Sequence, residues 1–220
     1  MELKLYEKFI LLAINSEKER FTGSHTFLRY ALAGAFLYDL YLQDKITLIG
    51  NKIKINKYNL SGNRVLDDIL RRINESRKDR IVRYWIYKIG YRSFRFRKKI
   101  LAEMSMKSMI KISDHRFMGF IPYKKYKILK PKLKEQIIGD AINDLFKNKS
   151  IARENLFLLS LMDYWMMRRI FPERNQRKTA KKEIREFVRQ NSFSRVIIRA
   201  ITRLVARHRS NGVVISASGI

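Results

Sequence analysis

The residues best suited to chemistry in this chain of 220 residues are arginines that alternate with aromatic residues between Tyr91 and Arg97. An arginine side chain presents a planar fork of N–H donors, which can grip a phosphate group through two hydrogen bonds. Arg92 and Arg95 are three residues apart, as are Arg95 and Lys98, so on a helix these cations would share a face. The pattern indicates a surface that binds phosphate groups, and the alternative is an ordinary solvated helix face.

Carboxylate pairs are the next candidates for chemistry. Asp140 and Asp144 are four residues apart on a predicted helix, and Asp67 and Asp68 are adjacent. Such pairs can hold a metal ion or transfer protons, but most surface carboxylates have no chemical role. The chain has no Cys, its three His residues are far apart, and no phosphate loop, dinucleotide fingerprint or serine nucleophile turn occurs. We therefore expect a binding protein rather than an enzyme, with no metal and no cofactor.

The surplus of basic residues points to an anionic partner. The chain holds 48 Lys and Arg against 20 Asp and Glu, a net charge of +28. Residues 1–70 contain ten basic and eight acidic residues, so nearly all of the surplus lies beyond them, in the blocks Arg71–Lys99, Tyr123–Lys134 and Arg168–Arg209. Self-repulsion of this charge costs stability. The expected partner is therefore nucleic acid, an anionic membrane or an acidic protein.

Hydrophobic spacing predicts a mainly α fold, with one compact helical domain over residues 1–210 and a tail over 211–220 that could be disordered. Hydrophobic residues make up 46% of the chain, which is enough for a packed core. Trp85, Trp165 and the run Met162–Met167 are expected in that core. The expected helices are Leu3–Ile14, Thr26–Leu42, Val65–Ile73, Ile81–Ile89, Arg92–Lys107, Pro131–Phe146, Ala152–Ile170, Arg174–Arg189 and Phe193–Arg207.

Two short β-hairpins are expected among these helices. The first pairs Ile46–Ile49 with Lys52–Ile55 around a Gly-Asn turn. The second pairs Met109–Ile112 with Arg116–Ile121, with Ser113–His115 as its turn. The second arm ends in residues that are apolar at nearly every position. A strand with two apolar faces is buried, paired with a partner or inserted in lipid.

No part of the chain is expected to cross a membrane. A spanning helix needs about 20 apolar residues, and the longest apolar runs here are far shorter. Charged residues interrupt the apolar stretch at the N-terminus, so it does not resemble a signal peptide. The protein is therefore expected to be soluble or to bind a membrane from one side.

Five landmarks follow one another along the chain in a recognisable order. They are Leu5–Ala13 followed by Thr22-Gly23, then Leu32–Ile46, then Ser61–Leu70, then Trp85-Ile86, and finally Arg97, Leu101, Lys107, Met109 and Ile110. Each motif is weak alone, but their order and spacing from Leu5 to Arg189 resemble the Golgi phosphoprotein 3 family. Because the chain starts directly at this region, without the long N-terminal extension of eukaryotic members, a bacterial member is expected.

The resemblance implies a mainly α-helical domain with a protruding β-hairpin that serves membrane contact and self-association. Eukaryotic members of the family bind phosphatidylinositol 4-phosphate at Golgi membranes and sort glycosyltransferases through their cytosolic tails. Their headgroup pocket uses a Trp, an Arg of the second helix and two Arg of the basic helix. In this sequence these pocket positions fall near Ser24 or His25, on Ala33, on Phe94 and on Arg97.

Other cations lie close to the pocket positions that are not matched. His25 and Arg29 share a helix face with Ala33, because the three are spaced four apart. Arg92 and Arg95 lie on either side of Phe94 in the sequence. The candidate headgroup-binding residues are therefore Arg97, Arg95, Arg92, Arg29, His25 and Lys98.

The leading interpretation is a peripheral membrane protein that binds anionic phospholipid headgroups, either phosphatidylinositol 4-phosphate or a bacterial anionic lipid. Phe117, Met118, Phe120 and Ile121 would insert into the membrane or pair with a second copy. Cytosolic tails of membrane proteins are further expected partners, and the expected location is the cytoplasm, at the cytosolic face of a membrane. The alternative is a basic helical protein that binds nucleic acid, since aromatic rings between arginines could stack on bases.

Overall fold

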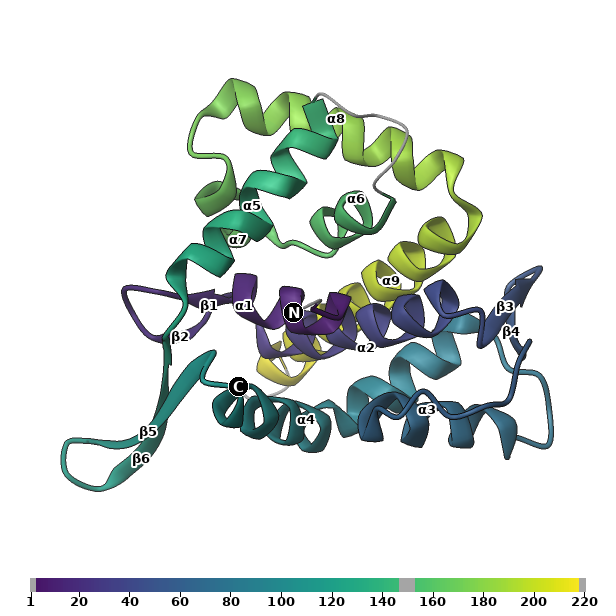
Figure 1. The fold of residues 1–220 in the computed structure, drawn as a ribbon, viewed down its shortest axis with the longest axis horizontal. Helices are drawn as coiled ribbons and strands as arrows, with labels where there is room; N and C mark the ends of the chain where they lie inside the picture. Colours follow the sequence, from purple (N-terminus) through teal and green to yellow (C-terminus); the bar gives the residue numbers. More distant parts are fainter. Residues whose placement is uncertain (1–2, 147–152, 218–220) are drawn as a thin grey trace. The chain divides into compact units, whose positions relative to one another are not determined.

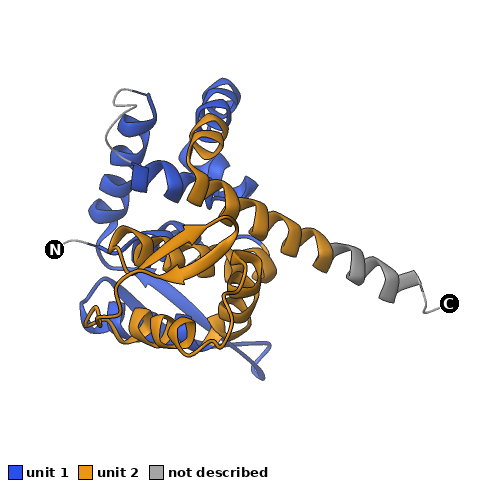
Figure 2. Ribbon diagram, turned by 90° about the vertical axis from the view of Figure 1, so that its right-hand side faces the viewer, with its two compact units in different colours: residues 1–23, 95–184 blue, residues 24–94, 185–220 orange. Residues whose placement is uncertain are grey.

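The computed structural model describes residues 3–146 and 153–217, with side chains as far as His208. Over these residues the chain forms nine helices and three two-stranded antiparallel hairpins (Figure 1), which confirms the mainly α fold class. The chain divides into two compact units, residues 1–23 with 95–184 and residues 24–94 with 185–220 (Figure 2). No described helix combines the length and the hydrophobicity needed to cross a bilayer.

Unit 1 is built around a short, largely buried N-terminal helix. Its elements are α1 (Leu5–Ala13), β1 (Ile14–Asn15), β2 (Arg20–Phe21), the last part of α4 (Val82–Met106), β5 (Ile110–Phe117), β6 (Ile121–Ile128), α5 (Pro131–Phe146), α6 (Arg153–Ser160), α7 (Tyr164–Ile170) and most of α8 (Arg174–Gln190). The apolar positions Leu5, Phe9 and Leu12 are buried, as their helical spacing predicts. Helix α1 packs against α5 and α6, which place Ile137 and Phe157 in the core of this unit.

Unit 2 centres on a helix that is buried on every side from Tyr30 to Leu40. Its elements are α2 (His25–Leu42), β3 (Ile46–Ile49), β4 (Lys52–Ile55), α3 (Arg64–Asn74), the first half of α4, the end of α8, and α9 (Ser192–Ala217). Ser24 caps α2, because its Oγ accepts the N–H of Phe27 at 3.1 Å. Helix α2 packs against α9, where the rings of Tyr41 and Phe193 stack with centroids 4.1 Å apart. The expected hairpin of β3 and β4 is confirmed with its Gly-Asn turn.

The first half of helix α4 differs from the sequence prediction. Two helices are expected around Gly90, but α4 runs through it without a break. A Cβ atom at Gly90 would lie 2.6 Å from Cδ1 of Tyr30, closer than side-chain atoms approach one another. The glycine therefore allows α2 and α4 to pack closely, and it does not end the helix.

The segment after residue 152 also differs from its prediction. One helix is expected over Ala152–Ile170, but two are present, and Ala152 itself lies outside the described residues. Asp163 starts the second helix, because its Oδ1 accepts the N–H of Met166 at 2.8 Å. The break leaves Trp165 57% exposed while Met166 is buried. The prediction of a core Trp is therefore wrong for Trp165 and confirmed for Trp85, which is 5% exposed.

The C-terminal segment is helical over most of the residues predicted as a tail. Helix α9 continues to Ala217, and residues 218–220 lie outside the described part of the chain. The boundaries of a single domain over 1–210 stay a prediction.

Candidate functional site

The β5–β6 hairpin ends in a group of exposed apolar side chains. Phe117, Met118, Phe120 and Ile121 are 55%, 73%, 71% and 48% exposed, and we call these four residues the apolar tip. Figure 1 shows the hairpin extending beyond the helices of unit 1. Grouped apolar side chains at the surface mark a site that meets another molecule.

The turn of this hairpin lies later in the sequence than predicted. Strand β5 continues to Phe117, so Asp114 pairs with Lys124 instead of forming the turn. Met118 and Gly119 have φ angles of +51° and +79°, and the N–H of Phe120 donates to the carbonyl of Phe117 at 3.3 Å. Positive φ at both central residues is typical of the tight turns that close hairpins, and glycine favours it. The hairpin is thus confirmed, but its turn at Ser113–His115 is wrong, and most of the expected return arm is the exposed tip.

The base of the hairpin is braced by the short turn that joins β1 to β2. The N–H of Tyr126 donates to the carbonyl of Glu19 at 2.7 Å, and the Tyr126 ring meets the edge of Phe21 at 5.1 Å. The guanidinium of Arg20 lies 4.2 Å from the centre of the Tyr123 ring, a cation–π contact. These contacts fix the base of the hairpin against the β1–β2 turn, and the apolar tip lies at its far end.

The two strands behind the apolar tip are strongly basic. Residues 110–128 contain five Lys or Arg and one acid, Asp114. Asp114 accepts from Lys124 at 2.7 Å, and this hydrogen bond raises the pKa of the lysine. Lys111 and Lys127 lie directly opposite each other across the strands, where like charges destabilise a sheet. An anion bound along the strands would relieve that repulsion.

Arg97, the candidate that matches the family's pocket, is partly buried in unit 1. Its guanidinium lies 5.0 Å from the centre of the Phe21 ring. Burial lowers the pKa of Arg97, and the nearby Tyr126 opposes that shift. Arg97 therefore joins the structure that braces the hairpin base, with part of its side chain still accessible.

The other basic candidates on α4 are exposed. Arg92, Arg95 and Lys98 follow at intervals of three residues, which places them on neighbouring turns of one helix. Phe94 and Tyr91 are also exposed on this helix. The expected series of cations with aromatic neighbours is therefore present on the surface of α4.

The candidates on α2 have different environments. His25 is exposed at the first position of the helix. Arg29 is held in place, because its Nη2 lies 2.9 Å from the Tyr30 hydroxyl oxygen and 2.5 Å from Nε2 of His208 on α9. Arg29 is thus part of a hydrogen-bonded cluster within unit 2.

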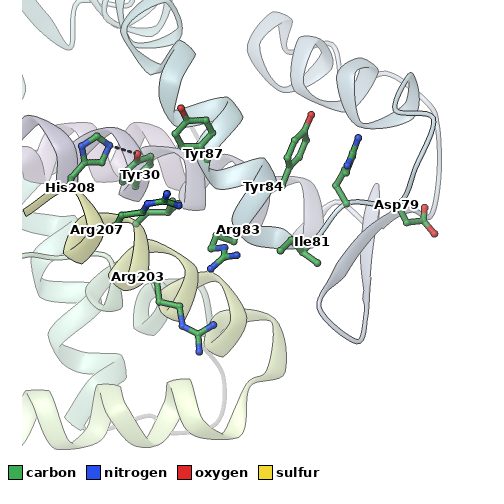
Figure 3. A pocket seen from close by; sticks show the side chains of 11 residues that line it. Tyr30, Asp79, Ile81, Arg83, Tyr84, Tyr87, Arg203, Arg207 and His208 are labelled. Carbon is green, nitrogen blue, oxygen red and sulfur yellow. Dashed lines mark hydrogen bonds between the residues drawn. The ribbon is translucent and has the colours of Figure 1, made fainter. Parts of the chain in front are cut away.

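That cluster borders a cavity which the sequence reasoning missed. The cavity lies within unit 2 and has a volume of about 680 Å³ (Figure 3). Four arginines line it: Arg80 just before α4, Arg83 at the start of α4, and Arg203 and Arg207 of α9. The signal in the sequence was the presence of two separate basic blocks, which does not reveal that α4 and α9 face each other. The described residues contain no group of three or more His, Asp or Glu arranged to hold a metal ion.

Comparison with known proteins adds one match. A family model described as Golgi phosphoprotein 3 (GPP34) matches residues 5–204. The matched region contains the β5–β6 hairpin and all of the candidate headgroup-binding residues. A comparison with curated proteins gave no match.

Proposed function

Because the chain belongs to the Golgi phosphoprotein 3 family, we propose that it is a peripheral membrane protein that binds anionic phospholipid headgroups. The family is consistent with lipid binding in general. The finer proposal is that the apolar tip enters the lipid while cations of β5 and β6 contact phosphates at the cytosolic face of a membrane. Phosphatidylinositol 4-phosphate and phosphatidylglycerol are the two headgroups to compare.

The apolar tip is the observation that carries this proposal. Four large apolar side chains are kept in water at the end of a basic hairpin. Each cation close to an anionic membrane contributes about 1 kcal/mol, and burying one Phe side chain contributes about 1.5–3 kcal/mol. The combination fits a membrane surface, where an apolar interior lies directly beneath a layer of phosphates.

Co-sedimentation with vesicles tests the proposal. The full chain is mixed at about 150 mM salt with vesicles of phosphatidylcholine alone, or with phosphatidylglycerol or phosphatidylinositol 4-phosphate added. Binding is expected only where an anionic lipid is present. The double variant Phe117→Asp and Phe120→Asp is expected to bind at least tenfold more weakly, because two apolar groups are lost from the lipid.

A matched control uses two apolar residues of unit 2 that are also more than half exposed. The double variant Ile49→Asp with Leu60→Asp lowers the net charge by the same amount as the tip variant, and both residues are 56% exposed. The affinity of this control for anionic vesicles is expected to stay within about twofold of the wild-type affinity, a change in binding free energy below roughly 0.5 kcal/mol. Equal recovery on neutral and anionic vesicles, or equal losses in both double variants, would reject the proposal. Mass measurement of the tip variant in solution also tests the predicted self-association through the hairpin.

Nucleic-acid binding is the second candidate function. The observation that favours it is the exposure of Tyr91 and Phe94 next to Arg92 and Arg95 on α4. Exposed rings beside cations can stack on unpaired bases. An electrophoretic shift with single-stranded nucleic acid at about 150 mM salt is the test, since weak non-specific complexes mostly dissociate there. Tight retardation that is lost in Tyr91→Ala with Phe94→Ala would favour this function over membrane binding.

A further inference from the structure

The arginine-lined cavity of unit 2 has the size and chemistry of a binding site. Its volume of about 680 Å³ falls in the range of small-molecule sites, roughly 300–1,000 Å³. Figure 3 shows Arg83 of α4 on one side, and Arg203 and Arg207 of α9 on the other. We call this cavity the arginine pocket. It contains no residue of the β5–β6 hairpin.

The arginine pocket carries a large surplus of positive charge. Asp79 is the one acidic residue among the described residues that line it, and Lys54 already pairs with its carboxylate at 3.1 Å. Arg83 and Arg203 form no ion pair with any carboxylate in the described part of the chain. Arg83 and Arg203 therefore add uncompensated positive charge to the pocket, so the site is suited to a ligand with several negative charges.

The wall at the start of α4 is fixed by backbone hydrogen bonds. The N–H of Ile53 donates to the carbonyl of Arg80 at 3.0 Å, and the N–H of Val82 donates to the carbonyl of Asn51 at 2.9 Å. The Arg80 guanidinium also lies 4.9 Å from the centre of the Tyr84 ring. The β3–β4 hairpin therefore holds this wall, and Tyr84 restrains Arg80.

The other end of the pocket combines aromatic rings with hydrogen-bonding groups. His208 Nε2 lies 3.0 Å from the Tyr30 hydroxyl oxygen, the hydrogen bond drawn in Figure 3. Tyr87 also lines the pocket, and its ring is partly exposed. Tyrosine rings and hydroxyls are suited to a sugar, inositol or base ring that carries phosphate groups.

From these features we infer that the arginine pocket binds a phosphate ester with two or more negative charges, with its ring against the tyrosines. Arginine forks grip phosphate oxygens through paired hydrogen bonds, which a single lysine ammonium cannot reproduce. The same chemistry is offered by a soluble phosphorylated metabolite and by a phosphorylated lipid headgroup. The inference depends on the proposed membrane function only if the source is a headgroup.

Calorimetric titration of the full chain tests the inference with two defined probes, inorganic pyrophosphate and inositol 1,4-bisphosphate. The pocket variant is Arg83→Gln with Arg203→Gln, and the control is Arg71→Gln with Arg199→Gln. All four arginines are exposed, and both variants lose two positive charges. The pocket variant is expected to raise Kd for inositol 1,4-bisphosphate at least tenfold, and the control less than twofold. A thermal melt of each variant confirms that it is folded.

A second variant distinguishes a site that needs the geometry of arginine side chains from one that needs positive charge alone. Arg83→Lys with Arg203→Lys keeps the charge and removes the forks, so binding is expected to weaken several-fold. No measurable heat with either probe, or equal weakening in the pocket variant and its control, would overturn the inference.

Competition identifies the source of the phosphate ester. If inositol 1,4-bisphosphate displaces the chain from vesicles that contain phosphatidylinositol 4-phosphate, the pocket holds a lipid headgroup. If it binds without displacing the chain, the ligand is soluble. The tip variant Phe117→Asp with Phe120→Asp is expected to lose vesicle binding and to keep the soluble probe, which separates the two proposals.

Discussion

Lys134 of α5 is a half-buried cation that completes hydrogen bonds at the end of α1. Its Nζ donates to the carbonyl of Ile14 at 2.6 Å and lies 3.1 Å from the Ser16 hydroxyl. Arg169 donates to the same carbonyl at 3.3 Å, so two cations meet at this helix end. Burial, and then the charge of Arg169, lower the pKa of Lys134 to about 8.

This lowered pKa predicts that stability depends on pH above neutrality. Between about pH 8 and the ordinary lysine pKa of 10.5, the unfolded chain keeps a proton on Lys134 that the folded chain has released. The free energy of unfolding therefore rises with pH in this window. Relative to Lys134→Met, the wild type is expected to gain roughly 0.5 kcal/mol per pH unit, below the limit of about 1.4 because the side chain is partly solvated.

Urea unfolding at a series of pH values between 7 and 10.5 measures the difference between wild type and Lys134→Met. Lys132→Met removes an exposed lysine from the same helix and serves as the control. A difference between wild type and Lys134→Met that stays constant across the window would contradict the prediction.

The two tryptophans show what residue type alone can and cannot predict. Trp85 is in the core, as its type suggests, but Trp165 is exposed. The run Met162–Met167 was expected in the core from its residue types, within one helix over Ala152–Ile170, whereas a new helix begins after the cap at Asp163 and leaves Trp165 exposed. The position of a helix break sets which face is buried, and a carboxylate within an apolar run was its one sign in the sequence.

Fluorescence quenching can distinguish these two tryptophans. Acrylamide is expected to quench part of the native emission readily, because Trp165 is accessible and Trp85 is not. Trp165→Phe should abolish the readily quenched part, and Trp85→Phe should keep it. Equally efficient quenching in both variants would contradict the exposure of Trp165 and the burial of Trp85.

At the scale of elements, close packing of α2 on α4 depends on Gly90. In an exposed helix, replacing Gly by Ala stabilises by about 0.5–1 kcal/mol. At Gly90 the added Cβ would meet the Tyr30 ring at 2.6 Å and 2.9 Å, so the ring or the helix must move. Gly90→Ala is therefore expected to lower the free energy of unfolding by about 1–3 kcal/mol, the usual cost of overpacking.

Gly139 of α5 provides the matched control for this prediction. A Cβ at Gly139 would have no atom within 4 Å, so Gly139→Ala is expected to stabilise by about 0.5–1 kcal/mol. Urea unfolding of both variants gives the two changes with opposite signs. If both variants are stabilised, Gly90 is not a packing site.

The elements also show how far the sequence could predict the candidate site. Helix spacing and the β3–β4 turn were readable, because they depend on neighbours in the sequence. The β5–β6 turn could not be predicted in the same way. Asp114 is a residue type that is common in turns, and yet it pairs with Lys124 within the strands. The arginine pocket brings together Arg83 of α4 and Arg203 of α9, which are 120 residues apart in the sequence. The charge pattern of the sequence does not show that these two helices pack together.

At the scale of the whole molecule, the dominant electrostatic feature is the surplus of positive charge. With 48 basic and 20 acidic residues, one-to-one pairing would still leave a net charge of +28. Repulsion among exposed cations is screened by salt, since the Debye length falls from about 30 Å at 0.01 M to about 8 Å at 0.15 M. The folded state brings these charges closer together than the unfolded chain does, so salt is expected to favour folding.

Thermal unfolding in increasing NaCl tests this expectation. The melting temperature is expected to rise between about 0.01 M and about 0.15 M, by roughly 2–4 °C for each kcal/mol gained. Lys178 and Lys182 are exposed on α8, and Lys178→Glu with Lys182→Glu changes the charge by two at each site, from +28 to +24. This variant should show a shallower rise, and Lys178→Arg with Lys182→Arg should keep the wild-type rise. A melting temperature that does not depend on NaCl would mean that the folded chain tolerates its charge without an anionic partner, which would remove one reason to expect such a partner.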